Sequence, residues 1–205
     1  MTEYYLSENI YIYQGKYFKN HTLINNKNWH SILSSIGWIK LDKSWIIRFN
    51  NLNKPKYKSN SCWGVFDTDN NGDCFFSCIA EAFNNNNKLL DNEKILDSLF
   101  IRTEISKEIT ESNFKEIMNI YEIEDLCNEF KHSWKINDIK NYKDLRKELV
   151  TLGHNYWADH IIIQLFQKKF NINLIILNKS HNKKQTKLYP LLADLKRDVS
   201  TIILY

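Results

Sequence analysis

The spacing of hydrophobic and polar positions changes along this chain, and it predicts helices first and strands late. Apolar residues at helical intervals predict helices over 74–83, 95–109, 113–120, 123–130, 142–152 and 157–170. Continuous apolar runs at 172–177 and 199–205 predict two buried strands. The helical spacing within 95–109 predicts that one face of this helix is buried and that it carries Ile95, Leu99, Ile105 and Ile109. This order indicates an α+β (α/β-like) fold, with helices packed around a small β-sheet.

Residues 1–60 have a different pattern, rich in aromatic side chains. Ile10–Tyr13 and the stretch after Gly15 predict a short hairpin, and 29–36 predicts a helix that ends at Gly37. Residues 43–49 predict a strand, and the polar stretch 50–60 predicts a linker or long loop. We therefore divide the chain into an N-terminal extension, 1–60, and a core domain, 61–205.

Composition narrows the class of protein. Hydrophobic residues make up 43% of the chain and aromatic residues 14%, which favours a folded globule over a disordered tail. No apolar run reaches the roughly 18 residues that span a bilayer, and the N-terminus has no signal-peptide pattern. We expect a cytoplasmic protein with no membrane partner.

Charge and cysteine content narrow the class further. The net charge of +4 is mild and the lysines alternate with acidic residues, so we expect no nucleic-acid partner and read 183–187 as a solvated loop.

Four cysteines without an export signal indicate free thiols in a reducing compartment. Cys74 and Cys78 lack the second ligand pair of a zinc site, so we read Cys78 as a core residue and expect no metal. The chain has neither a P-loop nor a dinucleotide fingerprint, and we expect no cofactor.

One cysteine is distinguished by its position. Cys74 follows the polar turn 70–73 and begins an apolar helical pattern. The first backbone N–H groups of a helix have no partner within it, and together with the helix dipole they favour a thiolate over a thiol. A cysteine at this place can act as a nucleophile. The competing interpretation is a small buried apolar residue.

Two stretches resemble the ovarian-tumour (OTU) family of cysteine proteases. Asn71-Gly72-Asp73-Cys74-Phe75-Phe76 is similar to the family's nucleophile segment, Asp-Gly-x-Cys-Leu/Phe-Phe at the start of a helix. Tyr156-Trp157-Ala158-Asp159-His160, with the helix and strand after it, resembles the family's Trp-containing helix and central strand. Arg102 lies where the family often has a Leu-x-Arg helix. The likeness extends from Trp63 to Tyr205 and is to the OTU-like proteases of large DNA viruses in particular.

This resemblance implies a papain-like cysteine protease core and a role for each residue of the turn. Cys74 would attack the isopeptide or peptide bond after the C-terminus of ubiquitin or a ubiquitin-like protein, as a thiol-dependent deubiquitinase does. Backbone N–H groups of Cys74 and of the turn would hold the oxyanion, and Gly72 allows the tight turn. Asn71 occupies the family's Asp position, where it keeps the turn-forming hydrogen bonds but loses a charge. Asp73 has no expected role beyond its backbone.

The family's catalytic histidine has no counterpart in this sequence. In the family it follows the last core strand, and 201–205 resembles the strand that leads to it. We therefore expect a protease domain that lacks its C-terminal end. His154 and His160 flank the Trp157 helix. As candidates for the catalytic general base they are weaker than a histidine after the last strand, because a histidine is more often structural or surface-exposed. Weaker still are the histidines in polar or irregular contexts: His21, His30, His132 and His181.

Three functions are open at this point. The first is an OTU-like deubiquitinase. The second is a catalytically dead OTU-fold module that binds ubiquitin or a host protein. The third is a cysteine acyltransferase or another papain-like protease, which the same cysteine at a helix start would serve.

Overall fold

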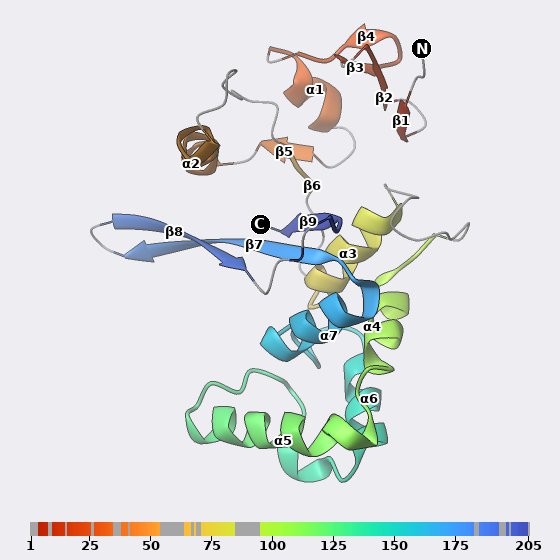
Figure 1. The fold of residues 1–205 in the computed structure, drawn as a ribbon, viewed down its shortest axis with the longest axis vertical. Helices are drawn as coiled ribbons and strands as arrows, with labels where there is room; N and C mark the ends of the chain where they lie inside the picture. The colour runs from red at the N-terminus through yellow and green to blue at the C-terminus, as the bar shows by residue number, and fades with distance from the viewer. Residues whose placement is uncertain are drawn as a thin grey trace. The chain divides into compact units, whose positions relative to one another are not determined.

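The chain forms two compact units, Met1–Thr68 and Asp69–Tyr205, in the computed structural model (Figure 1). The domain boundary predicted from the sequence lies earlier, after residue 60. The structure describes the whole chain except residues 1–3, 8–9, 15, 26, 35–37, 41, 54–63, 67, 69–70, 85–94, 183–184, 193–195, 197 and 205.

Within its described residues, unit 1 holds a four-stranded and a two-stranded antiparallel sheet and two helices. The larger sheet follows chain order through β1 (Tyr4–Ser7), β2 (Ile10–Tyr13), β3 (Lys16–Lys19) and β4 (Thr22–Leu23). The predicted hairpin is confirmed, because β2 and β3 pair with Tyr13 opposite Lys16. Helix α1 (Trp29–Leu33) is shorter than predicted, and Gly37 lies outside the described residues. The smaller sheet pairs β5 (Trp38–Lys40) with β6 (Gly64–Phe66).

The predicted strand at 43–49 is wrong, because these residues begin helix α2 (Lys43–Asn53), which also takes in the start of the predicted linker. A short run of aromatic and β-branched residues does not distinguish a strand from a buried helix by its periodicity. The deciding signal is Asp42, whose Oδ1 accepts a hydrogen bond from the Ser44 amide at 2.8 Å and so satisfies a donor of the first turn. Trp45 is 1% exposed and Ile47 is 49% exposed, which fits one buried helix face.

Unit 2 begins with helices at the places the sequence predicts, although their ends differ. They are α3 (Cys74–Asn84), α4 (Ser98–Ser106), α5 (Glu111–Leu126), α6 (Tyr142–Val150) and α7 (His160–Phe170), with a 3-10 turn, η2 (Ile136–Asp138), before α6. Helix α5 joins two predicted helices into one. Helix α7 begins later than predicted because Asp159 caps it, accepting a hydrogen bond on Oδ1 from the Ile162 amide at 2.8 Å.

The buried face of α4 is rotated from its predicted position. Ile105 and Ile109 are buried as expected, but Leu99 is 41% exposed and Ile95, which precedes the helix, is 92% exposed. Arg102 takes a fully buried position instead. Helix α4 begins at Ser98 because Asp97 is its N-cap: the Oδ1 atom of Asp97 accepts a hydrogen bond from the Phe100 amide at 2.7 Å.

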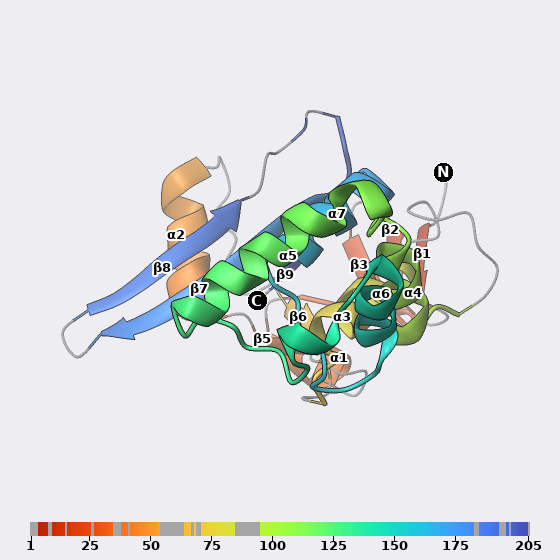
Figure 2. The same cartoon turned by 90° about the horizontal axis from the view of Figure 1, so that it is seen from below.

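The late strands form a three-stranded sheet in the order β8-β7-β9. The predicted strands correspond to β7 (Asn173–Asn182) and β9 (Thr201–Leu204), which run parallel with Leu174 opposite Ile202. The strand β8 (Gln185–Leu192) was not predicted, and it occupies part of the stretch read as a solvated loop. It pairs antiparallel with β7; the two strands run side by side in Figure 2, and their hairpin extends beyond α3 and α7 in Figure 1.

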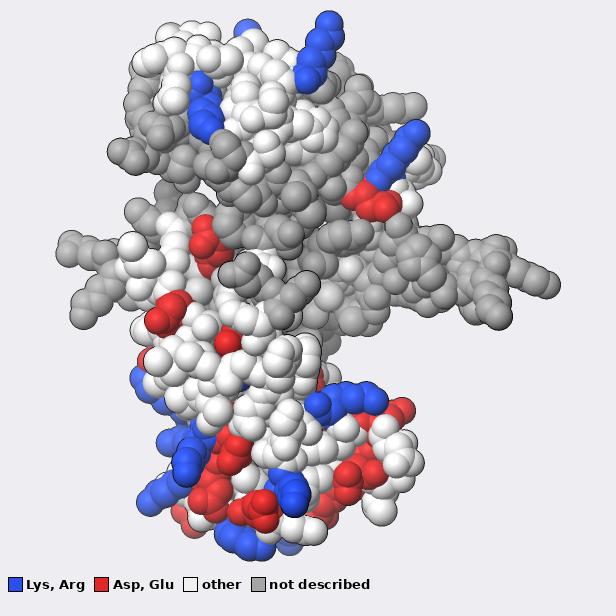
Figure 3. All heavy atoms as spheres, turned by 180° about the vertical axis from the view of Figure 1, so that it is seen from behind, with Lys and Arg blue, Asp and Glu red and all other residues white. Residues whose placement is uncertain are grey.

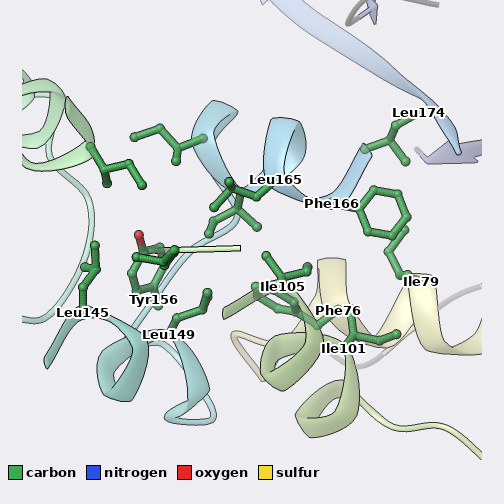
Figure 4. Packing of buried hydrophobic residues seen from close by; sticks show 14 of the residues in the cluster. Phe76, Ile79, Ile101, Ile105, Leu145, Leu149, Tyr156, Leu165, Phe166 and Leu174 are labelled. Atoms are coloured by element: carbon green, nitrogen blue, oxygen red, sulfur yellow. The ribbon is translucent and has the colours of Figure 1, made fainter. Parts of the chain in front are cut away.

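One hydrophobic core joins the helices of unit 2 to its sheet. Helices α3 and α7 pack against β9 and β7, and α4 contacts α3, α6 and α7 (Figure 1). Figure 4 shows the side chains that meet there, among them Phe76, Ile105 and Phe166. The fold class is therefore α+β, as predicted. Within the ranges that the structure describes, no helix is both long and apolar enough to cross a bilayer.

Candidate active site

Cys74 is the first residue of α3, directly after the turn formed by Asn71, Gly72 and Asp73. The Asp73 carbonyl accepts the first helical hydrogen bond, from the Ser77 amide at 2.8 Å. Cys74 is a free cysteine of intermediate exposure. The helix start therefore places a cysteine of intermediate exposure at the first backbone N–H groups of α3, which have no partner within the helix itself.

The turn before Cys74 is tightly packed against a second loop. Gly72 has a φ of +87°, and a Cβ atom built on it would lie 2.5 Å from the carbonyl carbon of Gly153 and 2.5 Å from the amide nitrogen of His154. Only glycine fits this conformation and this contact without displacement of the backbone. The contact brings the loop around Gly153 directly beside the candidate nucleophile.

Asn71 keeps the turn in shape through its side chain. Its Oδ1 accepts a hydrogen bond from the Asp73 amide at 3.0 Å, which is an Asx turn. A neutral amide oxygen is sufficient for this bond. Asn71 can therefore fill the turn-forming role for which the resemblance implies an aspartate.

The side chain of Asp73 has a structural role that the sequence analysis missed. The residue is 5% exposed, and its carboxylate accepts a hydrogen bond from Arg102 Nε at 2.7 Å and another from the Gly153 amide at 2.9 Å. These bonds tie the residue before Cys74 to α4 and to the neighbouring loop. A buried carboxylate needs such partners, since an unpaired charge in the interior is strongly unfavourable.

Arg102 is fully buried and connects three segments behind the nucleophile turn. Its Nη1 donates to the Leu149 carbonyl at 2.9 Å, and its Nη2 donates to the Tyr156 carbonyl at 3.1 Å. Its guanidinium lies 3.9 Å from the centre of the Phe76 ring on α3. Burial lowers the pKa of Arg102 from its usual value, and the ion pair with Asp73 opposes that effect. An arginine keeps its charge under these conditions, so the pair is ionic.

A second buried network holds the loop that contacts Gly72. The His132 ring accepts the Trp157 amide hydrogen on Nδ1 and donates from Nε2 to Asp159 Oδ2, both at 3.1 Å. The Tyr121 hydroxyl donates to the same carboxylate oxygen at 2.8 Å and is hydrogen-bonded to the Tyr156 hydroxyl. His132, whose side chain is 2% exposed, therefore has a structural role in a loop that the sequence analysis described as irregular.

The two candidate histidines lie in different surroundings. His154 is exposed, its backbone is at the Gly72 contact, and its ring centre is 5.2 Å from that of Trp157. His160 is the first residue of α7, and its exposed side chain is 3.6 Å from Glu124 Oε1. The structure thus brings His154, but not the Glu124-paired His160, to the loop beside the nucleophile turn.

No group of three or more His, Cys, Asp or Glu side chains in the described part of the chain is arranged to hold a metal ion. Cys62, a cysteine of the sequence, lies outside the described residues.

Comparison with known proteins finds no relative: no protein-family model, curated protein or solved structure matches the chain.

Proposed function

We propose that this protein is an OTU-like thiol protease that acts on bonds after the C-terminus of ubiquitin or a ubiquitin-like protein. The observation that carries the proposal is the position of Cys74, a free cysteine of intermediate exposure at the start of α3, directly after a turn held by the buried Asp73–Arg102 pair. The motif resemblance supplies the substrate class.

The reaction begins when a general base takes the proton of the Cys74 thiol. The Cys74 sulfur attacks the scissile carbonyl carbon, and backbone N–H groups at the helix start stabilise the oxyanion. Collapse of the intermediate breaks the C–N bond, the general base returns its proton to the leaving amine, and a thioester forms. Water then hydrolyses the thioester, which releases a carboxylate and restores the thiol. The resemblance implies that the base is a histidine after strand β9.

Hydrolysis of ubiquitin carrying a C-terminal fluorogenic amide, by the full-length protein, tests the proposal. We expect release of the fluorophore by the wild type, none by Cys74→Ala and unchanged release by Cys127→Ala, because Cys127 is an exposed cysteine at the C-cap of α5. Equal activity in Cys74→Ala and the wild type would contradict the proposal.

A second candidate is an OTU-fold module that binds ubiquitin without cleaving it. Among the described residues no hydrogen bond joins a histidine to Cys74, and this observation favours the binding module. The coding sequence after Tyr205 is the first discriminator, since a His-Tyr pair within the next codons favours the protease and a stop codon favours the binding module. Ubiquitin binding without any cleavage by the full-length protein would establish the second function.

A further inference from the structure

A cavity of about 470 Å³ lies beside the C-terminal half of α5, and it is separate from the candidate active site. Its walls come from the last turns of α5 and from the segment that continues to η2, and they include no residue of the nucleophile turn. The volume is within the range of about 300–1,000 Å³ typical of ligand sites. A ligand bound here would therefore not depend on the proposed protease function.

The lining combines acidic groups with aromatic and aliphatic surface. Glu122 and Asp125 are exposed on α5, and neither forms an ion pair with another described residue. Phe130 and Trp134 supply aromatic walls. Figure 3 shows acidic and basic side chains interspersed at the end of unit 2 that carries α5, so the charge that favours a cation is that of the two cavity carboxylates. Carboxylates next to aromatic rings are suited to a cationic side chain, which both attract.

Apolar surface extends beyond the cavity on the same helix. Leu126, which also lines the cavity, is 82% exposed, and Ile123 is 60% exposed. The two are three residues apart and so lie on one side of the helix. A small cation would leave both uncovered, whereas a peptide with an aliphatic residue next to the cationic one would cover them. The cavity lining also includes Lys135 and Asn137, whose side chains can donate hydrogen bonds to peptide carbonyl groups.

We propose that this cavity binds a peptide segment that carries a lysine or arginine next to an aliphatic residue. The basic side chain lies between Glu122, Asp125 and the aromatic walls, and the aliphatic side chain lies on Leu126. The peptide backbone accepts hydrogen bonds from the side chains of the η2 segment.

Trp134 gives the site a direct reporter. The residue is 7% exposed, and its indole N–H is buried without a hydrogen-bond partner among the described residues. Its NMR signal is identified by comparison with Trp134→Phe. Titration of the ¹⁵N-labelled protein with acetyl-Gly-Leu-Arg-Leu-Gly-amide is expected to shift this signal, and the same peptide with glutamate in place of arginine is expected not to.

A pair of charge-reversal variants tests the recognition. Glu122→Lys with Asp125→Lys is expected to weaken binding by about tenfold or more, because it replaces attraction with repulsion. The matched control, Glu111→Lys with Glu116→Lys, makes the same charge change at exposed positions nearer the start of α5 and is expected to bind as the wild type does. The proposal is overturned if the glutamate peptide binds equally well, if both double variants bind equally, or if millimolar arginine peptide leaves the Trp134 signal unchanged.

Discussion

Arg102 donates a hydrogen bond from Nε to Asp73 Oδ1 at 2.7 Å, and both side chains are buried directly behind Cys74. Since the two residues are far apart in sequence, this pair is a tertiary contact that fixes the start of α3. The same guanidinium donates to carbonyl groups of Leu149 and Tyr156. The local shape of the nucleophile turn is therefore coupled to the packing of unit 2 as a whole.

Arg102→Met is expected to lower the free energy of unfolding by about 3–5 kcal/mol, because it leaves the Asp73 carboxylate buried and unpaired. Urea denaturation measures the loss. The matched control is Arg146→Met, which removes a partly buried arginine that donates to the Ile109 carbonyl and leaves no carboxylate unpaired; we expect it to cost about 1 kcal/mol. Equal losses in the two variants would contradict the role given to the ion pair.

Gly72→Ala is expected to destabilise the protein and distort the nucleophile turn, because the new Cβ meets the backbone of Gly153 and His154. The control is Gly153→Ala, since Gly153 has a similar φ of +83° but its Cβ would lie 3.8 Å from the Asn71 carbonyl oxygen. We expect a loss of about 1 kcal/mol for the control, from the positive φ alone, and a clearly larger loss for Gly72→Ala. Thermal unfolding of both variants measures the two losses of stability. A larger loss for Gly153→Ala than for Gly72→Ala would contradict the close packing of Gly72 against the backbone of Gly153 and His154.

Asn71→Asp is expected to retain the turn, because a carboxylate oxygen can also accept the Asp73 amide hydrogen. Asn71→Ala removes the acceptor of this 3.0 Å bond and is expected to lower stability by about 1 kcal/mol. The two variants are compared by urea denaturation and by the rate of fluorophore release from the ubiquitin substrate. An alanine variant as stable as the aspartate variant would show that the Asx turn does not hold the loop.

The buried pair Tyr121 and Tyr156 is expected to make the free energy of unfolding fall as the pH rises above about 10. Burial raises the pKa of Tyr121 and of Tyr156 well above the usual value, and the Asp159 charge adds to the effect on both. A pKa that is raised on folding contributes stability that is fully present below the unfolded value of about 10 and is lost as pH rises through the folded value. Tyr121→Phe is therefore expected to show a smaller fall in unfolding free energy above pH 10 than the wild type.

The control for this prediction is Tyr142→Phe, which removes a hydroxyl from a partly exposed tyrosine at the start of α6. It is expected to follow the wild-type pH dependence. Urea midpoints measured on either side of pH 10 give the comparison. A Tyr121→Phe curve parallel to that of the wild type would exclude the buried phenol as the source of the dependence.

Local sequence signals predicted the start of α3 well, because a glycine turn and apolar residues at helical spacing are both short-range features. They failed at residues 43–49, where the run Trp45-Ile46-Ile47 fits either strand or helix until the Asp42 cap is considered. The Asp73–Arg102 pair could not be read from spacing, since it joins the turn before α3 to helix α4, far along the chain. Its one sequence signal was an arginine between Ile101 and Ile105 on an apolar helix face, which predicts a buried partner of opposite charge.

The most direct test of the account is covalent labelling of the full-length protein by ubiquitin that carries a C-terminal electrophile. We expect a single adduct, mapped by mass spectrometry to Cys74, with the exposed Cys127 unmodified. We also expect slower labelling in Arg102→Met at a temperature where that variant is folded. A folded protein that gives no adduct, or an adduct at Cys127 instead, would contradict the claim that Cys74 is the nucleophile of a ubiquitin-directed protease.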